Sequence, residues 1–286
     1  MRVLLTTDGS KEAMAAMRAA CRLLTKEDRK IDVLYVAPQP RAPKSGKIDK
    51  REYEHRMAAE TKRILEDAKQ ALAEEGVDAL TLAEIGSPAN VIMREAEDYD
   101  VSVIGAKGRD GGSMGGLGPV ASRLVEHATG CVLVGREPPS DKGMRILVPV
   151  DGSDGANDAV DALNSFFDLE SADVTLLHVI ESLWLPQDSD DEPLAPQLSA
   201  ELRREAEQLL NEARARVFEH HPGVTTLVRD GTPANEILSE ADQGDYDLVV
   251  VGAGGATDMK HSILGSVSTK VAWNAPCSVL VVRTPE

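Results

Sequence analysis

The stretch VVVGAGGATDMKHSILGSVSTKVAWNAP, from Val249 to Pro276, determines how the rest of the chain is interpreted. A short apolar run leads into Gly252 and Gly255, and nine residues later Gly265 and Ser266 precede a helical pattern. Glycine leaves backbone N–H groups open to a ligand, and a helix N-terminus adds unpaired N–H groups and a positive dipole end. The spacing G-x2-G-x9-G-S predicts a phosphate cradle, or, on spacing alone, a tight strand-to-helix connection.

Blocks of this pattern occur twice in the same order, which indicates a duplicated domain. The paired blocks are VLLTTDGS (3–10) with ILVPVDGS (146–153), GSPANVI (86–92) with GTPANEI (231–237), YDVSVIGAKG (99–108) with YDLVVVGAGG (246–255), and CVLVG (131–135) with CSVLVV (277–282). We therefore expect a first domain at residues 1–136, a Pro-rich and charged linker at 137–143, and a second domain at 144–286.

Each half alternates short apolar runs with helical stretches. Runs such as LVVVG have the length and β-branching of buried parallel strands, and strands that alternate with helices predict an α/β fold with helices on both faces of a parallel sheet. The DGS tripeptides at 8–10 and 151–153 supply N-caps for the first helix of each half. Ser87 and Thr232, each followed by proline, are expected to begin a later helix.

Composition excludes several classes of function. The 286 residues carry a net charge of −17, which disfavours nucleic acid and anionic membranes as partners. No apolar run approaches the length of a membrane span, and Asp8 comes too early for a signal peptide, so we expect a cytoplasmic protein without membrane insertion. The three cysteines, at 21, 131 and 277, form no C-x-x-C pair, so no zinc site or disulfide framework is expected.

Taken together, the motifs resemble those of the universal stress protein family, over nearly the whole chain. They are VDGS (150–153), LHVI (177–180), GTPA (231–234), YDLVVVG (246–252), the glycine loop and APCSVLVV (275–282). The resemblance implies two tandem Rossmann-like domains of the adenine nucleotide alpha hydrolase-like type, each a five-stranded parallel sheet of order 3-2-1-4-5. Such a sheet has a crevice at its topological switch point, between strands 1 and 4.

The resemblance also implies ATP as ligand, with Mg²⁺ on its phosphates but no protein metal site. In the second domain, the residues that match the family's base and ribose contacts are Pro149, Val150, Asp151 and Val179. Those that match its phosphate cradle are Gly252, Gly255, Gly265, Ser266, Val267 and Ser268. From the sequence alone, Asp151 can instead serve as a helix cap.

The first half departs from the motif at one position. Pro119 stands where serine or threonine is expected, and proline has neither a hydroxyl nor an N–H group. We therefore expect ATP chiefly in the second domain and a weaker or empty first site, although Lys107 and Arg109 can offset the loss through charge. The corresponding first-domain residues are Thr7, Asp8, Val36, Gly105, Gly108, Gly118 and Val120.

No nucleophile–base pair accompanies the motif. His178 lies within an apolar run and is expected to be a packed histidine, and His261 and Lys260 lie in the glycine loop. The leading hypothesis is an ATP-binding regulatory or stress-response protein that shows at most weak ATP hydrolysis. The alternatives are a slow ATPase or nucleotide-transferring enzyme on the same fold, and an interaction scaffold that needs no nucleotide.

Assembly follows from the duplication. Single-domain relatives pair through their last strands, so residues 132–135 and 278–282 are expected to pair within one chain as a pseudo-dimer, which would cover two edge strands. A homodimer and an unidentified protein partner stay open at this point.

Overall fold

The computed structural model describes residues 1–25, 28–39, 50–109, 116–137, 143–170, 172–181, 195–217, 223–254 and 264–284. The chain divides into two compact units, Met1–Glu137 with Thr284–Glu286, and Pro138–Arg283. Most of the predicted linker, 138–142, lies outside the described residues.

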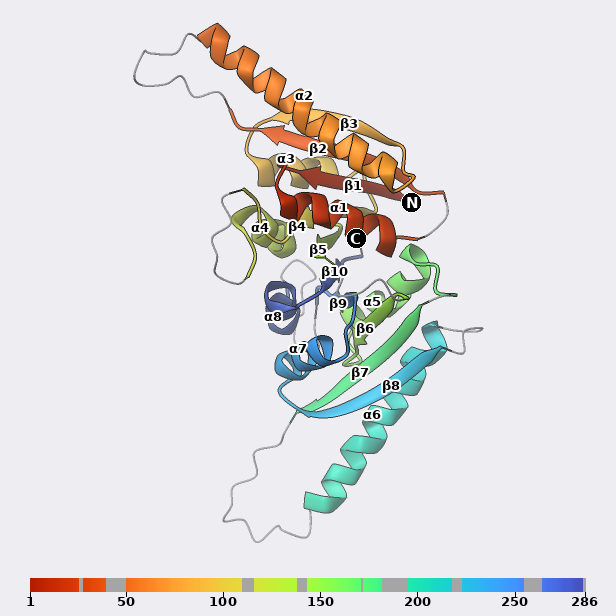
Figure 1. Ribbon diagram of the computed structural model, residues 1–286. Helices are drawn as coiled ribbons and strands as arrows, with labels where there is room; N and C mark the ends of the chain where they lie inside the picture. The colour runs from red at the N-terminus through yellow and green to blue at the C-terminus, as the bar shows by residue number, and fades with distance from the viewer. Residues whose placement is uncertain are drawn as a thin grey trace. The chain divides into compact units, whose positions relative to one another are not determined.

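The first unit alternates strands and helices as the sequence predicts. Its elements are β1 (Arg2–Thr7), α1 (Lys11–Leu23), β2 (Lys30–Ala37), α2 (Lys50–Glu74), β3 (Ala79–Ile85), α3 (Pro88–Ala96), β4 (Val101–Gly105), α4 (Pro119–His127) and β5 (Cys131–Gly135). The strands are parallel in the order β3-β2-β1-β4-β5. Helices α1 and α2 cover one face of the sheet, and α3 and α4 cover the other (Figure 1).

The second unit repeats this plan. Its elements are β6 (Arg145–Pro149), α5 (Asp154–Phe166), β7 (Asp173–Glu181), α6 (Ala195–Val217), β8 (Val224–Gly231), α7 (Pro233–Gln243), β9 (Leu248–Gly252), α8 (Ser266–Asn274) and β10 (Ser278–Val282). The order β8-β7-β6-β9-β10 is again parallel, with α5 and α6 on one face and α7 and α8 on the other. Both units therefore confirm the predicted order 3-2-1-4-5.

The core of each unit is aliphatic and lies along the central strands. All residues of β4, β5, β9 and β10 are buried, which explains their continuous apolar sequences. The edge strand β3 differs, because Leu80 and Ile85 are 72% and 63% exposed. The three cysteines are buried as small apolar residues. Among the described residues, no helix is both long and apolar enough to cross a membrane.

The first helix of each unit begins as the sequence predicts. The Ser10 hydroxyl accepts a hydrogen bond from the Ala13 N–H at 3.1 Å, and Ser153 caps α5 through Ala156 at 3.2 Å. The caps expected at Ser87 and Thr232 are different, because neither side chain makes a capping hydrogen bond. Proline at the first helical position has no N–H group to satisfy, and its fixed φ begins these two helices instead.

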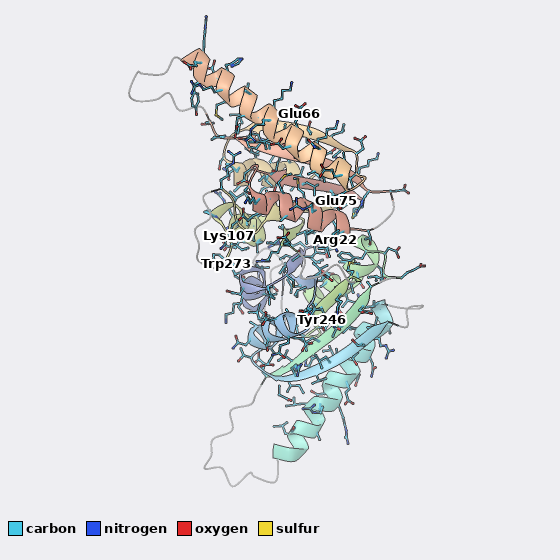
Figure 2. All side chains as sticks on the ribbon, in the orientation of Figure 1. Arg22, Glu66, Glu75, Lys107, Tyr246 and Trp273 are labelled. Atoms are coloured by element: carbon cyan, nitrogen blue, oxygen red, sulfur yellow. The ribbon has the colours of Figure 1, made fainter. Side chains whose placement is uncertain are left out.

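A three-residue clamp joins the start of strand 1 to the start of strand 4 in both units. In the second unit, Asp247 accepts the Arg145 N–H at 2.9 Å, and the Asp247 N–H donates to the Arg145 carbonyl. The Arg145 guanidinium lies 5.2 Å from the ring centroid of Tyr246, which Figure 2 labels. Asp100, Arg2 and Tyr99 repeat the arrangement in the first unit. The Tyr-Asp pair of each YD motif therefore has a structural role.

We expect Asp247→Ala to destabilise the second unit by about 1–3 kcal/mol, because the 5% exposed Asp247 leaves the Arg145 N–H without its acceptor. Asp100→Ala should cost less, since Asp100 is exposed and water can replace it. Asp247→Asn keeps an oxygen acceptor, so its loss of stability should lie between those of Asp247→Ala and Asp100→Ala. Urea unfolding followed by circular dichroism measures all three; equal losses for Asp247→Ala and Asp100→Ala would contradict this account.

Candidate functional site

An aspartate turn follows strand 1 in both units. The Ser10 N–H donates to Asp8 Oδ1 at 2.9 Å across Gly9, whose φ of +78° suits glycine. Asp151 accepts from the Ser153 N–H at 3.0 Å, and Gly152 has a φ of +81°. The serine caps the helix and the aspartate shapes the turn before it. The alternative in which Asp151 itself caps α5 is therefore wrong.

Glycine at the end of strand 4 is required by the approach of the first helix. A Cβ on Gly105 would lie 3.0 Å from the backbone of Glu12 and Ala13, at the start of α1. The second unit is tighter, because a Cβ on Gly252 would lie 2.0 Å from the Gly155 carbonyl oxygen. These two glycines therefore have a packing reason that is independent of any ligand.

The loop after β4 closes onto the aspartate turn in the first unit. The Arg109 N–H donates to Asp8 Oδ2 at 2.9 Å, and a Cβ on Gly108 would lie 2.6 Å from the same oxygen. Loops from two strands that are distant in sequence therefore meet through one carboxylate, beside the switch point.

A cavity of about 380 Å³ lies at this meeting point in the first unit. All seven residues expected there line it: Thr7, Asp8, Val36, Gly105, Gly108, Gly118 and Val120. Sequence reasoning missed Tyr35 on β2 and the apolar pair Ile92 and Ile104, which also line the cavity. For Ile92 the sequence did contain a signal. Pro88 and Ile92 are four residues apart, which places both on one face of α3, and both line the cavity.

Several backbone N–H groups of the first-unit loop already have acceptors within the protein. The Gly118 N–H donates to the Ala106 carbonyl at 2.7 Å, and the Ser122 N–H donates to the Gly118 carbonyl at 2.9 Å. Pro119 has no N–H group at all. Val120 lies in the first turn of α4, where helical geometry provides no acceptor, so its N–H remains suited to an anion.

The second unit repeats the strand ends but differs at the helix. Ser266 is exposed at the first position of α8, where Pro119 stands in α4, and Val267 follows in the first turn. The buried Ser268 hydroxyl donates to the Gly252 carbonyl at 2.6 Å, so it ties α8 to β9. The Gly265 N–H donates to Ala253 at 2.7 Å, as Gly118 does to Ala106.

The remaining second-unit residues follow from the register. Pro149 ends β6, Val150 and Asp151 follow it, and Val179 lies near the end of the neighbouring β7. The Nδ1 atom of His178 is 2.8 Å from the Val150 carbonyl oxygen, which confirms a packed histidine. Gly255, Lys260 and His261 lie outside the described residues.

Two charged side chains, Lys107 and Arg109, are among the residues that line the first-unit cavity. The Arg109 guanidinium is 3.1 Å from Glu60 on α2, and Lys107, labelled in Figure 2, also lines the cavity. A hydrogen bond from Arg63 lowers the pKa of Glu60, and Arg109 acts in the same direction. Burial raises the pKa of Tyr35, so its hydroxyl is neutral at neutral pH. Within the described ranges, no three histidine, cysteine or acidic side chains gather to hold a metal ion.

The fold defines a tandem pair of doubly wound α/β domains, each with an aspartate turn after its first strand, and in the first unit a cavity lies at the switch point. The universal stress protein family model matches residues 1–136 and 144–283. The chain therefore belongs to the universal stress protein family.

Related proteins agree with this assignment. A universal stress protein of Mycolicibacterium smegmatis is 28% identical over 298 residues, covering 98% of this chain and 96% of the relative. Universal stress protein YxiE of Bacillus subtilis is 32% identical over 150 residues, covering 49% of this chain and 98% of the relative. The crystal structure of a universal stress protein from Archaeoglobus fulgidus aligns over 99% of this chain with a TM-score of 0.70 and 22% identity, which supports the fold.

Because Gly252 and Gly118 are packed differently, alanine at these two positions should affect stability differently. Gly252→Ala should destabilise the second unit by about 1–3 kcal/mol or more, because the new methyl group meets the backbone of Gly155. Gly118→Ala should leave stability nearly unchanged, since its Cβ would have 3.5 Å to its nearest neighbour and its φ is −70°. Thermal unfolding of both variants is the measurement, and a Gly252→Ala protein as stable as the wild type would refute the packing reason.

Proposed function

We propose that this universal stress protein binds ATP, chiefly in its second domain, and acts as a nucleotide-dependent regulatory protein in the stress response. A cytoplasmic location, where ATP is abundant, belongs to the same proposal. The observation that carries the preference is the pair of helix starts: exposed Ser266 begins α8, whereas Pro119 begins α4.

The second-domain strand ends fit the two parts of a nucleotide. Val150 follows β6 and Val179 lies near the end of the neighbouring β7, so their side chains can cover an apolar base, and the Asp151 carboxylate can accept hydrogen bonds from ribose hydroxyls. A Cβ added to Gly254 would meet no described atom within 4 Å, so this position at the end of β9 leaves room for a ligand. This combination of an apolar wall, a carboxylate and an unobstructed glycine at the strand end suits a nucleoside triphosphate.

The helix start supplies the phosphate end of the site. The N–H groups of Ser266 and Val267 lie in the first turn of α8, where no intrahelical acceptor exists, and the helix dipole favours an anion there. The Ser266 hydroxyl adds a donor that proline cannot supply. Mg²⁺ bound to ATP would neutralise part of the phosphate charge, which matters in a chain with a net charge of −17.

Regulation fits the described residues better than rapid turnover does. His178 is held by the Val150 carbonyl within β7, and the Arg109 guanidinium is paired with Glu60. Neither is positioned to activate a water molecule, so any ATP hydrolysis should be weak. Nucleotide occupancy would instead change which protein partner binds.

Ser266→Asp tests the ATP site without disturbing the fold. Aspartate is favourable at a helix N-terminus, so α8 should keep its stability, while the new carboxylate repels the phosphates. We expect isothermal titration calorimetry with Mg·ATP to show one principal site per chain in the wild type and at least about tenfold weaker binding in the variant.

Pro119→Asp is the matched control in the first domain, because it places the same charge at the start of α4. It should leave the principal ATP affinity unchanged. If Pro119→Asp weakens the principal site while Ser266→Asp does not, the first domain holds the ATP. If the wild type binds no ATP, the nucleotide proposal fails and a scaffold role takes its place.

A further inference from the structure

The outer edge of the first-unit sheet is more apolar than the matching edge of the second unit. Strand β3 lies at one end of the strand order, and its Leu80 and Ile85 are 72% and 63% exposed. The motifs GSPA (86–89) and GTPA (231–234) follow β3 and β8 directly, so Leu80 corresponds to Thr225 and Ile85 to Asp230. The second unit therefore shows that this fold does not need an apolar side chain at either position.

The edge strand β8 is protected by charged side chains. Asp230 lies 2.7 Å from Arg203 on α6, and Arg229 lies 2.6 Å from Glu240 on α7. Charges along an exposed edge hinder the addition of another strand, which is a common protection of sheet edges. Strand β3 has a single charged residue, Glu84, so its edge is less protected.

Leu80 and Ile85 lie on opposite faces of β3. The register partner of Ile85 is Ala37, which packs with Ile64 of α2, so Ile85 lies on the α2 face. Side chains alternate along a strand, so Leu80, five residues earlier, lies on the other face. A ligand that covers both side chains must run along the edge, as an added strand does, because no ligand on one face reaches both.

One side of α2 lies next to this edge, as the matching helix of the second unit indicates. A Cβ added to the glycine of the aspartate turn would meet Ile64 in the first unit and Leu209 in the second, so α2 and α6 have the same register. Ala58 of α2 therefore corresponds to Arg203, which reaches the β8 edge. Figure 1 shows α2 running beside β3.

Two lysines lie on this side of α2. Lys62, Leu65 and Lys69 follow Ala58 at intervals of four, three and four residues, which repeat one side of a helix. Both lysines are exposed, and neither forms an ion pair with a residue that the structure describes. Glu60, which meets the glycine loop, lies on the opposite side of the helix. The α2 side of the β3 edge therefore has two cations available to a partner.

The net charge of −17 does not oppose an acidic partner at this edge. Residues 138–286 hold 26 acidic and 10 basic residues, whereas residues 1–137 hold 22 and 21, so the first half is nearly neutral. Salt screens more distant charges within about 8–10 Å. Glu66, labelled in Figure 2, offsets one of the two lysines, and Glu84 lies 3.7 Å from Arg94. The α2 side of the edge thus keeps a net positive charge.

We propose that the β3 edge binds an extended peptide of a protein partner by strand addition, and that this peptide alternates apolar and acidic residues. The outward N–H and C=O groups of β3 pair with the peptide backbone. Acidic side chains on the α2 face meet Lys62 and Lys69 and lay their methylene groups on Ile85, and apolar side chains on the other face cover Leu80. The proposal does not depend on ATP binding, so each can fail without the other.

The probe is a fluorescein-labelled peptide of sequence Val-Glu-Val-Glu-Val-Glu-Val, and its control replaces every glutamate with lysine. We expect fluorescence anisotropy with the full chain to show one site per chain for the acidic probe. The lysine probe should bind at least about fivefold more weakly, because it meets the two lysines with like charge. Added salt should weaken binding of the acidic probe.

Leu80→Thr combined with Ile85→Thr tests the apolar part of the edge. Threonine suits a strand and already stands at the position of Leu80 in the second unit, so the sheet should keep its stability. Affinity for the acidic probe should fall about tenfold through loss of apolar contact. Val228→Thr on β8 is the matched control at the other edge and should leave the affinity unchanged.

Lys62→Gln combined with Lys69→Gln tests the charged part. Affinity for the acidic probe should fall about fivefold, and most of its salt dependence should disappear. Arg56→Gln is the matched control, since Arg56 is an exposed cation of the same helix that is already paired with Glu52. If the edge variant loses its fold by circular dichroism, this helix-surface variant still tests where the peptide binds.

Several results would overturn the proposal. Absence of binding at up to about 1 mM acidic probe would exclude this class of peptide. Equal or tighter binding of the lysine probe would exclude the charge complementarity. An affinity that neither the edge variant nor the lysine variant lowers would place the peptide elsewhere. Dimerisation in sedimentation velocity that the edge variant abolishes would assign the β3 edge to a second copy of the chain.

Discussion

The pairing of strand 1 between strands 2 and 4 is the constraint on which each unit depends. Because β1 has β2 on one side and β4 on the other, the chain leaves the ends of neighbouring strands toward opposite faces, and a crevice opens between the departing loops. The Asp8 turn follows β1 and the glycine loop follows β4, so topology alone brings them together. The clamp between Arg2 and Asp100 secures the same pair of strands at their other end.

Two copies of one scaffold differ in a few side chains around the switch point. The backbone order, the aspartate turn and the bond from the loop to the helix N-cap are shared, as Gly118 to Ala106 and Gly265 to Ala253 show. The differences lie in side chains that meet a ligand's charge: Pro119 against Ser266, and a first-unit arginine paired with Glu60.

Much of this architecture could be predicted because the signals are local or repeated. Buried strands read as continuous apolar runs, and the spacing of Gly105, Gly108 and Gly118 placed them around one cavity. Glu60 could not be predicted, since it comes from the exposed side of a long charged helix and its partner is distant in sequence. The role of Ser268 could not be predicted from the sequence either. Its position in the glycine motif suggested a phosphate contact, but its hydroxyl donates to the backbone of β9.

The contact between the start of α5 and the end of β9 has a consequence for how the two halves can change. In the second unit Gly155 lies against Gly254, whose carbonyl oxygen would be 2.4 Å from a Cβ at position 155, whereas the first unit has Glu12 at the equivalent position. Exchange of the first helix alone between the duplicated segments would therefore produce a steric clash in one direction. The start of the first helix can therefore be exchanged between the halves only together with the end of the fourth strand on which it packs.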